Sequence, residues 1–228
     1  MLFYDWTWFI LIPALAFALW AQSRVTSTFQ RFSQVMASSR ATGEEAARTL
    51  LNKAGLFDVR VERIAGQLSD HYDPRSRVLR LSEPVWGSRS LAALGVAAHE
   101  AGHALQHASG YSPLALRNAI VPVAQFGSSL AFPLFFIGFI FNSAAWLMDL
   151  GILFFSAAVV FQALTLPVEF DASNRAIRLL QSEGFISGQE VAKTKQVLDA
   201  AAMTYVAATA MAALQLLRLV LLRGTRND

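Results

Sequence analysis

Three long apolar runs limit the folds open to this chain more than any other feature of its sequence. They cover residues 6–21, 119–141 and 150–166. Each is close to the roughly 20 residues that a helix needs to cross a bilayer. The chain is also 54% hydrophobic and only 15% charged, whereas soluble domains carry about 25% charged residues. We therefore predict a mainly α, integral membrane protein.

The basic residues predict the orientation of the first apolar run. Residues 1–5 contain no Lys or Arg, whereas Arg24, Arg31 and Arg40 follow the run. A cleaved signal peptide, the alternative, would carry its positive charges ahead of the run. The pattern favours an uncleaved anchor with its N-terminus outside and the next segment in the cytoplasm. We expect a multi-pass protein of the cell (inner) membrane.

A fourth apolar stretch, at residues 200–217, lies within a predicted helix over residues 189–222. Its length favours a further membrane span. Arg218, Arg223 and Arg226 near its end favour instead a helix that lies beside the bundle, because these side chains prefer the cytoplasm. The sequence leaves both readings open, so we expect three or four transmembrane helices.

The polar segment between the first two runs predicts short elements of a soluble fold. A capping-box pattern at Thr42–Glu45 predicts a helix that ends near Gly55. Strand patterns at residues 59–64 and 78–81, the second after a turn, predict a short β-hairpin. The hairpin either offers an edge to an extended peptide or is purely structural. His71 is expected to be a solvated turn residue.

One motif in the chain indicates a specific chemistry. His99-Glu100-Ala101-Gly102-His103 matches H-E-x-x-H and lies in a predicted helix from Ser90 to about Ala108. Residues four apart on a helix share a face, so both imidazoles can bind one metal ion. The neighbouring run of small and apolar residues predicts burial, and a buried Glu between two His needs a partner. We therefore predict a metal site.

A catalytic zinc site usually has three protein ligands and one water. The chain has no cysteine, so the third ligand must be His or a carboxylate. In H-E-x-x-H-x-x-G-x-x-H the Gly and third His would fall at Gln106 and Ser109, which excludes that class. Three His at four-residue spacing would span about 12 Å of helix, so we assign His107 a supporting or packing role.

Helical phase separates the two nearest downstream acids on the cytoplasmic side. Asp171 shares a face with Arg175, which makes an ordinary ion pair available. Glu169 shares a mostly apolar face with Ala172, Ser173, Ala176, Ile177 and Leu180. An acid on a packed face needs a partner such as a metal ion, so we predict Glu169 as the third ligand. The alternative is a pair between Glu169 and an Arg.

Three stretches resemble the YugP-type membrane zinc metallopeptidases: residues 70–74, 95–108 and 166–173. The likeness covers nearly the whole chain, and the plan is similar to the HtpX-type and CAAX-prenyl-protease metallopeptidases. In those families a later Glu ligand opens an E-[FY]-x-A-D pattern whose Asp helps to orient the site. Glu169-Phe170-Asp171-Ala172 matches its start, but Ser173 replaces the Asp. The resemblance implies a zincin-like catalytic part and Zn²⁺ as the cofactor.

We therefore expect a zinc-dependent endopeptidase with its active site on the cytoplasmic side. His99, His103 and Glu169 would hold zinc, and Glu100 would activate the zinc-bound water. Tyr205, His107 and Arg175 are candidates to stabilise the oxyanion. The alternative is a non-catalytic membrane scaffold with a structural metal site, which would have no turnover that depends on Glu100.

The same patterns predict a domain division and a set of partners. We expect an anchor at residues 1–22, a catalytic part at 23–118, a transmembrane helical pair at 119–166, and a third-ligand segment with a membrane-associated helix at 167–228. The expected partners are the lipid bilayer, peptide or protein substrates, membrane proteins among them, and partner membrane proteins. A net charge of +3 without a dense basic run gives no support for nucleic-acid binding.

Overall fold

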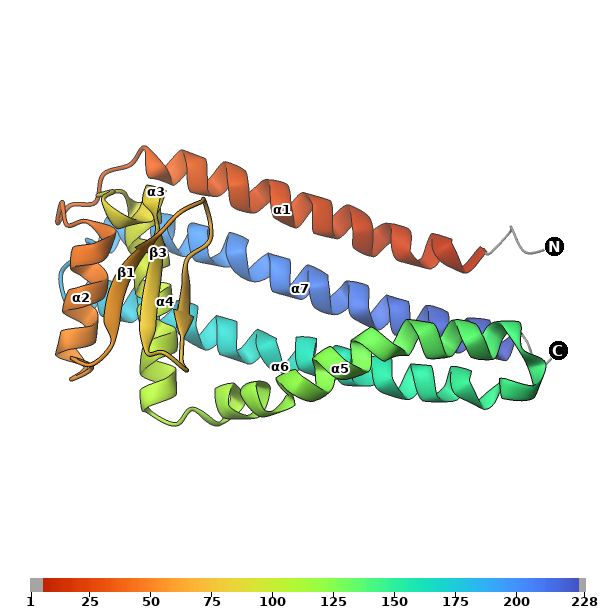
Figure 1. Ribbon diagram of the computed structural model, residues 1–228. Coiled ribbons are helices and arrows are strands. Elements are labelled where there is room, and N and C mark those ends of the chain that lie inside the picture. Colours follow the sequence, from red (N-terminus) through yellow and green to blue (C-terminus); the bar gives the residue numbers. More distant parts are fainter. Residues whose placement is uncertain (1–5, 226–228) are drawn as a thin grey trace. The chain divides into compact units, whose positions relative to one another are not determined.

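The computed structural model describes residues 6–225 and is mainly helical, as predicted (Figure 1). It divides into two compact units. The helical unit comprises residues 6–22, 115–167 and 204–225, and the mixed unit comprises residues 23–114 and 168–203.

The helices and strands follow one another along the chain in this order. They are η1 (Trp6–Leu11), α1 (Ile12–Ser33), α2 (Gly43–Lys53), β1 (Arg60–Ile64), β2 (His71–Asp73), β3 (Val78–Ser82), α3 (Glu83–Trp86), α4 (Leu91–Ala108), α5 (Ser112–Ile140), η2 (Asn142–Ala144), α6 (Trp146–Ser182) and α7 (Gly188–Gly224).

Four helical segments are long and apolar enough to cross a membrane. They are Trp6–Ser33, Ser112–Ile140, Trp146–Ser182 and Gly188–Gly224. Three of them contain the predicted apolar runs, and α7 contains the stretch that the sequence left open. Within the helical unit, α5 and α6 run antiparallel and are joined through η2 (Figure 1). The predicted mainly α membrane fold is confirmed.

The arginines of α7 have partners inside the helical unit. Arg218 is buried, its Nε donates to the Thr7 hydroxyl over 3.1 Å, and its guanidinium carbon lies 3.8 Å from the centre of the Trp8 ring. Arg223 Nε donates to the Asp149 carboxylate over 2.8 Å. A charge within an apolar helix is tolerated when it is paired in this way. These contacts remove the argument against a fourth span for Arg218 and Arg223, whereas Arg226 lies outside the described residues.

The small sheet of the mixed unit differs from the predicted hairpin. The two predicted strands, β1 and β3, are parallel neighbours, and the hairpin partner of β3 is β2. The sheet order is β1-β3-β2. The sequence analysis missed β2 because its three residues are polar and half-buried, without an alternating pattern. His71 is therefore a strand residue rather than a solvated turn residue.

Local capping signals correctly predicted two helices of the mixed unit. Thr42 and Glu45 form the capping box of α2, with the Glu45 amide donating to Thr42 Oγ1 and the Thr42 amide to Glu45 Oε2. The Ser90 hydroxyl accepts from the Ala93 amide at the start of α4. These bonds satisfy backbone donors that no helical carbonyl can reach. The helix that carries the motif therefore begins and ends where the sequence predicts.

Two helices run beyond their predicted ends. The anchor helix was expected to stop near residue 21, but α1 continues to Ser33 because Phe29 and Phe32 pack against the core of the mixed unit. Helix α6 also continues through Pro167 to Ser182, where the sequence suggested a break. Glu169 is therefore carried on the continuation of an apolar helix.

Gly102 permits the close approach of α4 and α6 in the mixed unit. A Cβ at this position would lie 2.9 Å from the Ala172 carbonyl oxygen, which belongs to the backbone and cannot rotate away. Alanine is favoured over glycine in a helix by about 1 kcal/mol, but overpacking costs about 1–3 kcal/mol. We expect Gly102→Ala to lower the thermal unfolding temperature of the protein in detergent.

Gly188→Ala is the matched control for this substitution, because a Cβ there meets nothing within 4 Å. It should leave the unfolding temperature unchanged or raise it slightly. A Gly102→Ala variant as stable as the wild-type protein would contradict the close approach of the two helices.

Candidate metal centre

Helix α4 brings the two motif histidines to one face. The side chains of His99 and His103 are 14% and 13% exposed, and their Nε2 atoms lie 3.1 Å apart. The rings meet edge to face, with their centres 4.7 Å apart. The two nitrogens therefore point toward one small region, as the four-residue spacing predicts.

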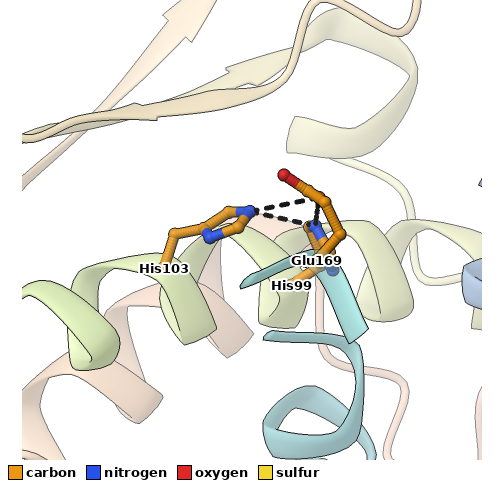
Figure 2. Close-up of side chains that lie close together, drawn as sticks. All are labelled: His99, His103 and Glu169. Atoms are coloured by element: carbon orange, nitrogen blue, oxygen red, sulfur yellow. Dashed lines mark hydrogen bonds and ion pairs between the residues drawn. The ribbon is translucent and has the colours of Figure 1, made fainter. Parts of the chain in front are cut away.

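Helix α6 supplies a carboxylate to the same region. Figure 2 shows Glu169 reaching from a second helix toward both rings. Its Oε2 lies 3.2 Å from His99 Nε2 and 3.5 Å from His103 Nε2, and the residue is only 2% exposed. The structure thus brings together the three residues that the sequence analysis proposed as ligands.

The spacing of these three atoms fits a tetrahedral metal ion. Zinc ligands lie about 2.0–2.1 Å from the metal, so two ligands of a tetrahedral site are roughly 3.3–3.4 Å apart. The three observed separations, 3.1, 3.2 and 3.5 Å, lie around this value. Two imidazoles and one carboxylate are also the ligand set of a common class of catalytic zinc site. The residues present therefore fit zinc.

The electrostatics of the cluster also favour a bound cation. Burial lowers the pKa of His103, but its hydrogen bond to Glu169 and the charges of Glu100 and Glu169 outweigh burial, so this pKa lies above its ordinary value. The neighbouring carboxylates thus favour a positive charge at this position. A divalent metal ion bound by neutral imidazoles would supply that charge in place of the proton.

Glu100 lies on α4 directly after His99 and is 8% exposed. Within residues 6–225, its carboxylate makes no hydrogen bond or ion pair. A buried carboxylate normally has such a partner. The charge of Glu100 acts on His103, so this carboxylate lies near the ligand cluster.

Three polar side chains support the histidines of α4. Ser173 Oγ lies 3.2 Å from His99 Nδ1, so the serine that departs from the family pattern still contacts a ligand. Gln106 Oε1 lies 3.0 Å from His103 Nδ1. The Tyr72 hydroxyl lies 2.9 Å from His107 Nδ1. The supporting role of His107 stays a prediction.

The other two oxyanion candidates lie on α6 and α7. Arg175 Nε donates to Asp171 over 2.5 Å, which is the ion pair that helical phase predicted. The Arg175 guanidinium carbon also lies 5.5 Å from the centre of the Tyr111 ring. Tyr205 belongs to the helical unit, whereas the cluster belongs to the mixed unit. Both oxyanion assignments stay predictions.

The contacts of Gln106 were not predicted from the sequence, where this position served only to exclude one motif class. The structure shows a fully buried side chain that joins α4 to α6. Its Nε2 donates to the Val168 carbonyl and to Asp171 Oδ2, each over 2.8 Å. The available signal was a long polar residue three positions after His103 in an otherwise apolar helix, since such a residue needs buried partners.

Two comparisons with known proteins agree with this arrangement. The family model described as "Putative neutral zinc metallopeptidase" matches residues 7–224. A Bacillus subtilis (strain 168) protein named "Putative membrane protease YugP" is 51% identical over 214 residues, which is 94% of this chain and 95% of that protein. No solved structure matches the chain. With its three-residue cluster, its apolar helices and a match over nearly its whole length, this membrane protein belongs to the neutral zinc metallopeptidase family.

Proposed function

We propose that this protein is a membrane-embedded, zinc-dependent endopeptidase. The observation that carries the proposal is the cluster of half-buried His99 and His103 with buried Glu169, beside Glu100, which has no hydrogen-bond partner among the described residues. A metal-ligand set beside a free base is the arrangement that hydrolysis by an activated water requires. The family and the name of the Bacillus subtilis relative support the same activity.

In the proposed mechanism, His99, His103 and Glu169 hold the metal. Zinc, when bound, lowers the pKa of a water toward about 7 and polarises the peptide carbonyl. Glu100 takes the proton from the attacking water and later delivers it to the departing amine. Its burial and its lack of a hydrogen-bond partner in the part of the chain that the structure describes suit this shuttle, because no existing bond there must break first.

Chelation tests the proposal against the scaffold alternative. We expect a zinc chelator to abolish cleavage of an unfolded test protein by the purified protein, and added zinc to restore it. A scaffold with a structural metal would cleave nothing before chelation, so a zinc-loaded, folded protein without any turnover would contradict the proposal. Circular dichroism after chelation controls for loss of the fold.

We also propose that the site faces the cytoplasm of the cell and that the joint between α5 and α6 faces outward. The joint carries no Lys or Arg, whereas the segment after α1 is rich in them, and basic segments stay inside. The chain has no natural cysteine, so single cysteines can report the side. We chose Ser143 in the joint and Gln67 in the mixed unit because both are exposed.

A membrane-impermeant thiol reagent should label Ser143→Cys in intact cells and Gln67→Cys only after lysis. The reverse pattern would place the site outside the cell. A cytoplasmic, membrane-proximal site would favour membrane proteins as substrates, with other membrane proteins as partners. Both of these remain proposals.

A further inference from the structure

The amide of Gln106 has only one orientation that satisfies its neighbours. On one side it faces the Val168 carbonyl and Asp171 Oδ2, each at 2.8 Å. A backbone carbonyl accepts only, and Asp171 is held as a carboxylate acceptor by Arg175. The amide nitrogen of Gln106 must therefore lie on this side, because only it can donate two bonds.

The same orientation determines the tautomer of His103. With its nitrogen directed to α6, Gln106 presents its oxygen to His103 Nδ1 at 3.0 Å. An amide oxygen accepts only, so His103 Nδ1 must carry the hydrogen. In the neutral ring, Nε2 then offers its lone pair to the cluster, where it lies 3.1 Å from His99 Nε2 and 3.5 Å from Glu169 Oε2.

The partners of Gln106 lie beside the third ligand. Val168 and Asp171 flank Glu169 on α6, so one short segment supplies a ligand and also anchors the amide. Gln106 is 0% exposed, and water therefore cannot replace either bond. His99 differs, because its Nδ1 faces the Ser173 hydroxyl at 3.2 Å. A hydroxyl both donates and accepts, so it does not select a tautomer.

We infer that Gln106, anchored by Asp171 and the Val168 carbonyl, is the positioning residue that selects the metal-binding tautomer of His103. The inference rests on the proposed function, since it assumes that the cluster binds zinc. Partners of this kind, which contact a ligand rather than the metal, typically change metal affinity by about 10–100-fold. The chain from Arg175 through Asp171 and Gln106 to His103 thus sets how tightly zinc is held.

Zinc affinity, measured by competition with a chromogenic chelator, tests this inference without any assay of activity. Gln106→Met keeps an unbranched side chain of similar length and removes both amide groups. We expect it to weaken zinc binding by about 10–100-fold. Asp171→Asn keeps its size and removes the charge that anchors the amide, and we expect a smaller but measurable loss of zinc affinity, because bonds of one network strengthen each other. Gln181→Met, at an exposed position on α6, is the matched control and should bind zinc as the wild type does.

Nitrogen-15 spectra of the metal-free protein supply a second measurement. The chain has only four histidines, so single replacements assign their signals. At a pH where the rings are neutral, wild-type His103 should be protonated at Nδ1, whereas Gln106→Met should show a mixture of both tautomers. A purely structural role for Gln106 would not change this ratio.

The outcomes separate this inference from the proposed function. Zinc affinities of both variants within twofold of the wild type, or a wild-type His103 protonated at Nε2, would overturn the inference alone. If Gln106→Met does not fold, the zinc affinity of Asp171→Asn tests the inference. This variant should fold, because the Asp171 side chain is partly exposed and the substitution keeps its size. A wild-type protein that binds no zinc would overturn both proposals, and a zinc-bound protein without turnover would overturn only the proposed function.

Discussion

Replacing Glu100 by Gln is expected to lower the rate of peptide hydrolysis by about 10²–10⁴-fold, the usual contribution of a general acid–base group. The amide has nearly the size of the carboxylate but cannot take up a proton. Because Glu100 is not one of the three clustered ligand residues, the variant should retain zinc. The measurement is the cleavage rate of an unfolded test protein, with the zinc content of the same sample determined in parallel.

Glu83→Gln is the matched control for Glu100→Gln. Its side chain is 57% exposed and pairs with Arg63 at the surface, so both turnover and zinc content should stay at wild-type levels. Unchanged turnover in Glu100→Gln would exclude Glu100 as the base. If Glu100→Gln is inactive, peptides that accumulate in cells with the active protein but not in cells with this variant would identify the substrates.

Replacing Glu169 by Gln should remove zinc rather than only slow catalysis. The substitution keeps the volume of a side chain that is 2% exposed but removes the negative charge from the cluster. The loss of a metal ligand should exceed the roughly 10–100-fold change in affinity that supporting residues produce. We expect the zinc-to-protein ratio to fall close to zero after dialysis against a chelator that leaves the wild type loaded.

The metal-free Glu169→Gln variant should remain folded, because the amide keeps the volume of the side chain and a neutral group costs less to bury than a charge. Asp199→Asn is its control, since Asp199 is 52% exposed and pairs with Lys195 on the same helix. A Glu169→Gln protein that binds zinc with wild-type affinity would show that the third ligand lies elsewhere. Taken together, the variants at residues 100 and 169 separate the base from the ligands.

Prediction from sequence succeeded where the governing interactions are local. The caps at Thr42 and Ser90 and the helix from Leu91 to Ala108 depend on residues a few positions apart, and all were correctly predicted. The phase argument that separated Glu169 from Asp171 also succeeded: Glu169 is buried, whereas Asp171 pairs with Arg175. Helical periodicity encodes which side of a helix is packed.

Prediction failed where pairing joins distant segments. The strands at residues 60–64 and 78–82 were identified, but their parallel pairing and the intervening β2 were not. Strand partners depend on the path of the whole segment, and the three polar residues of β2 carry no periodic signal. The extension of α1 to Ser33 was missed for a related reason, because Phe29 and Phe32 become helical contacts only when the core forms beside them.

The sequence by itself determined the apolar helices, the membrane class of the protein and the pair of histidines one helical turn apart, because each depends on length, composition or spacing within one helix. Only the tertiary structure decided that Glu169 lies 3.2 Å from His99 and that Gln106 joins His103 to Asp171. The contacts that α4 makes with α6 join residues more than 60 positions apart. They depend on how closely α4 and α6 pack at Gly102, which no local pattern encodes.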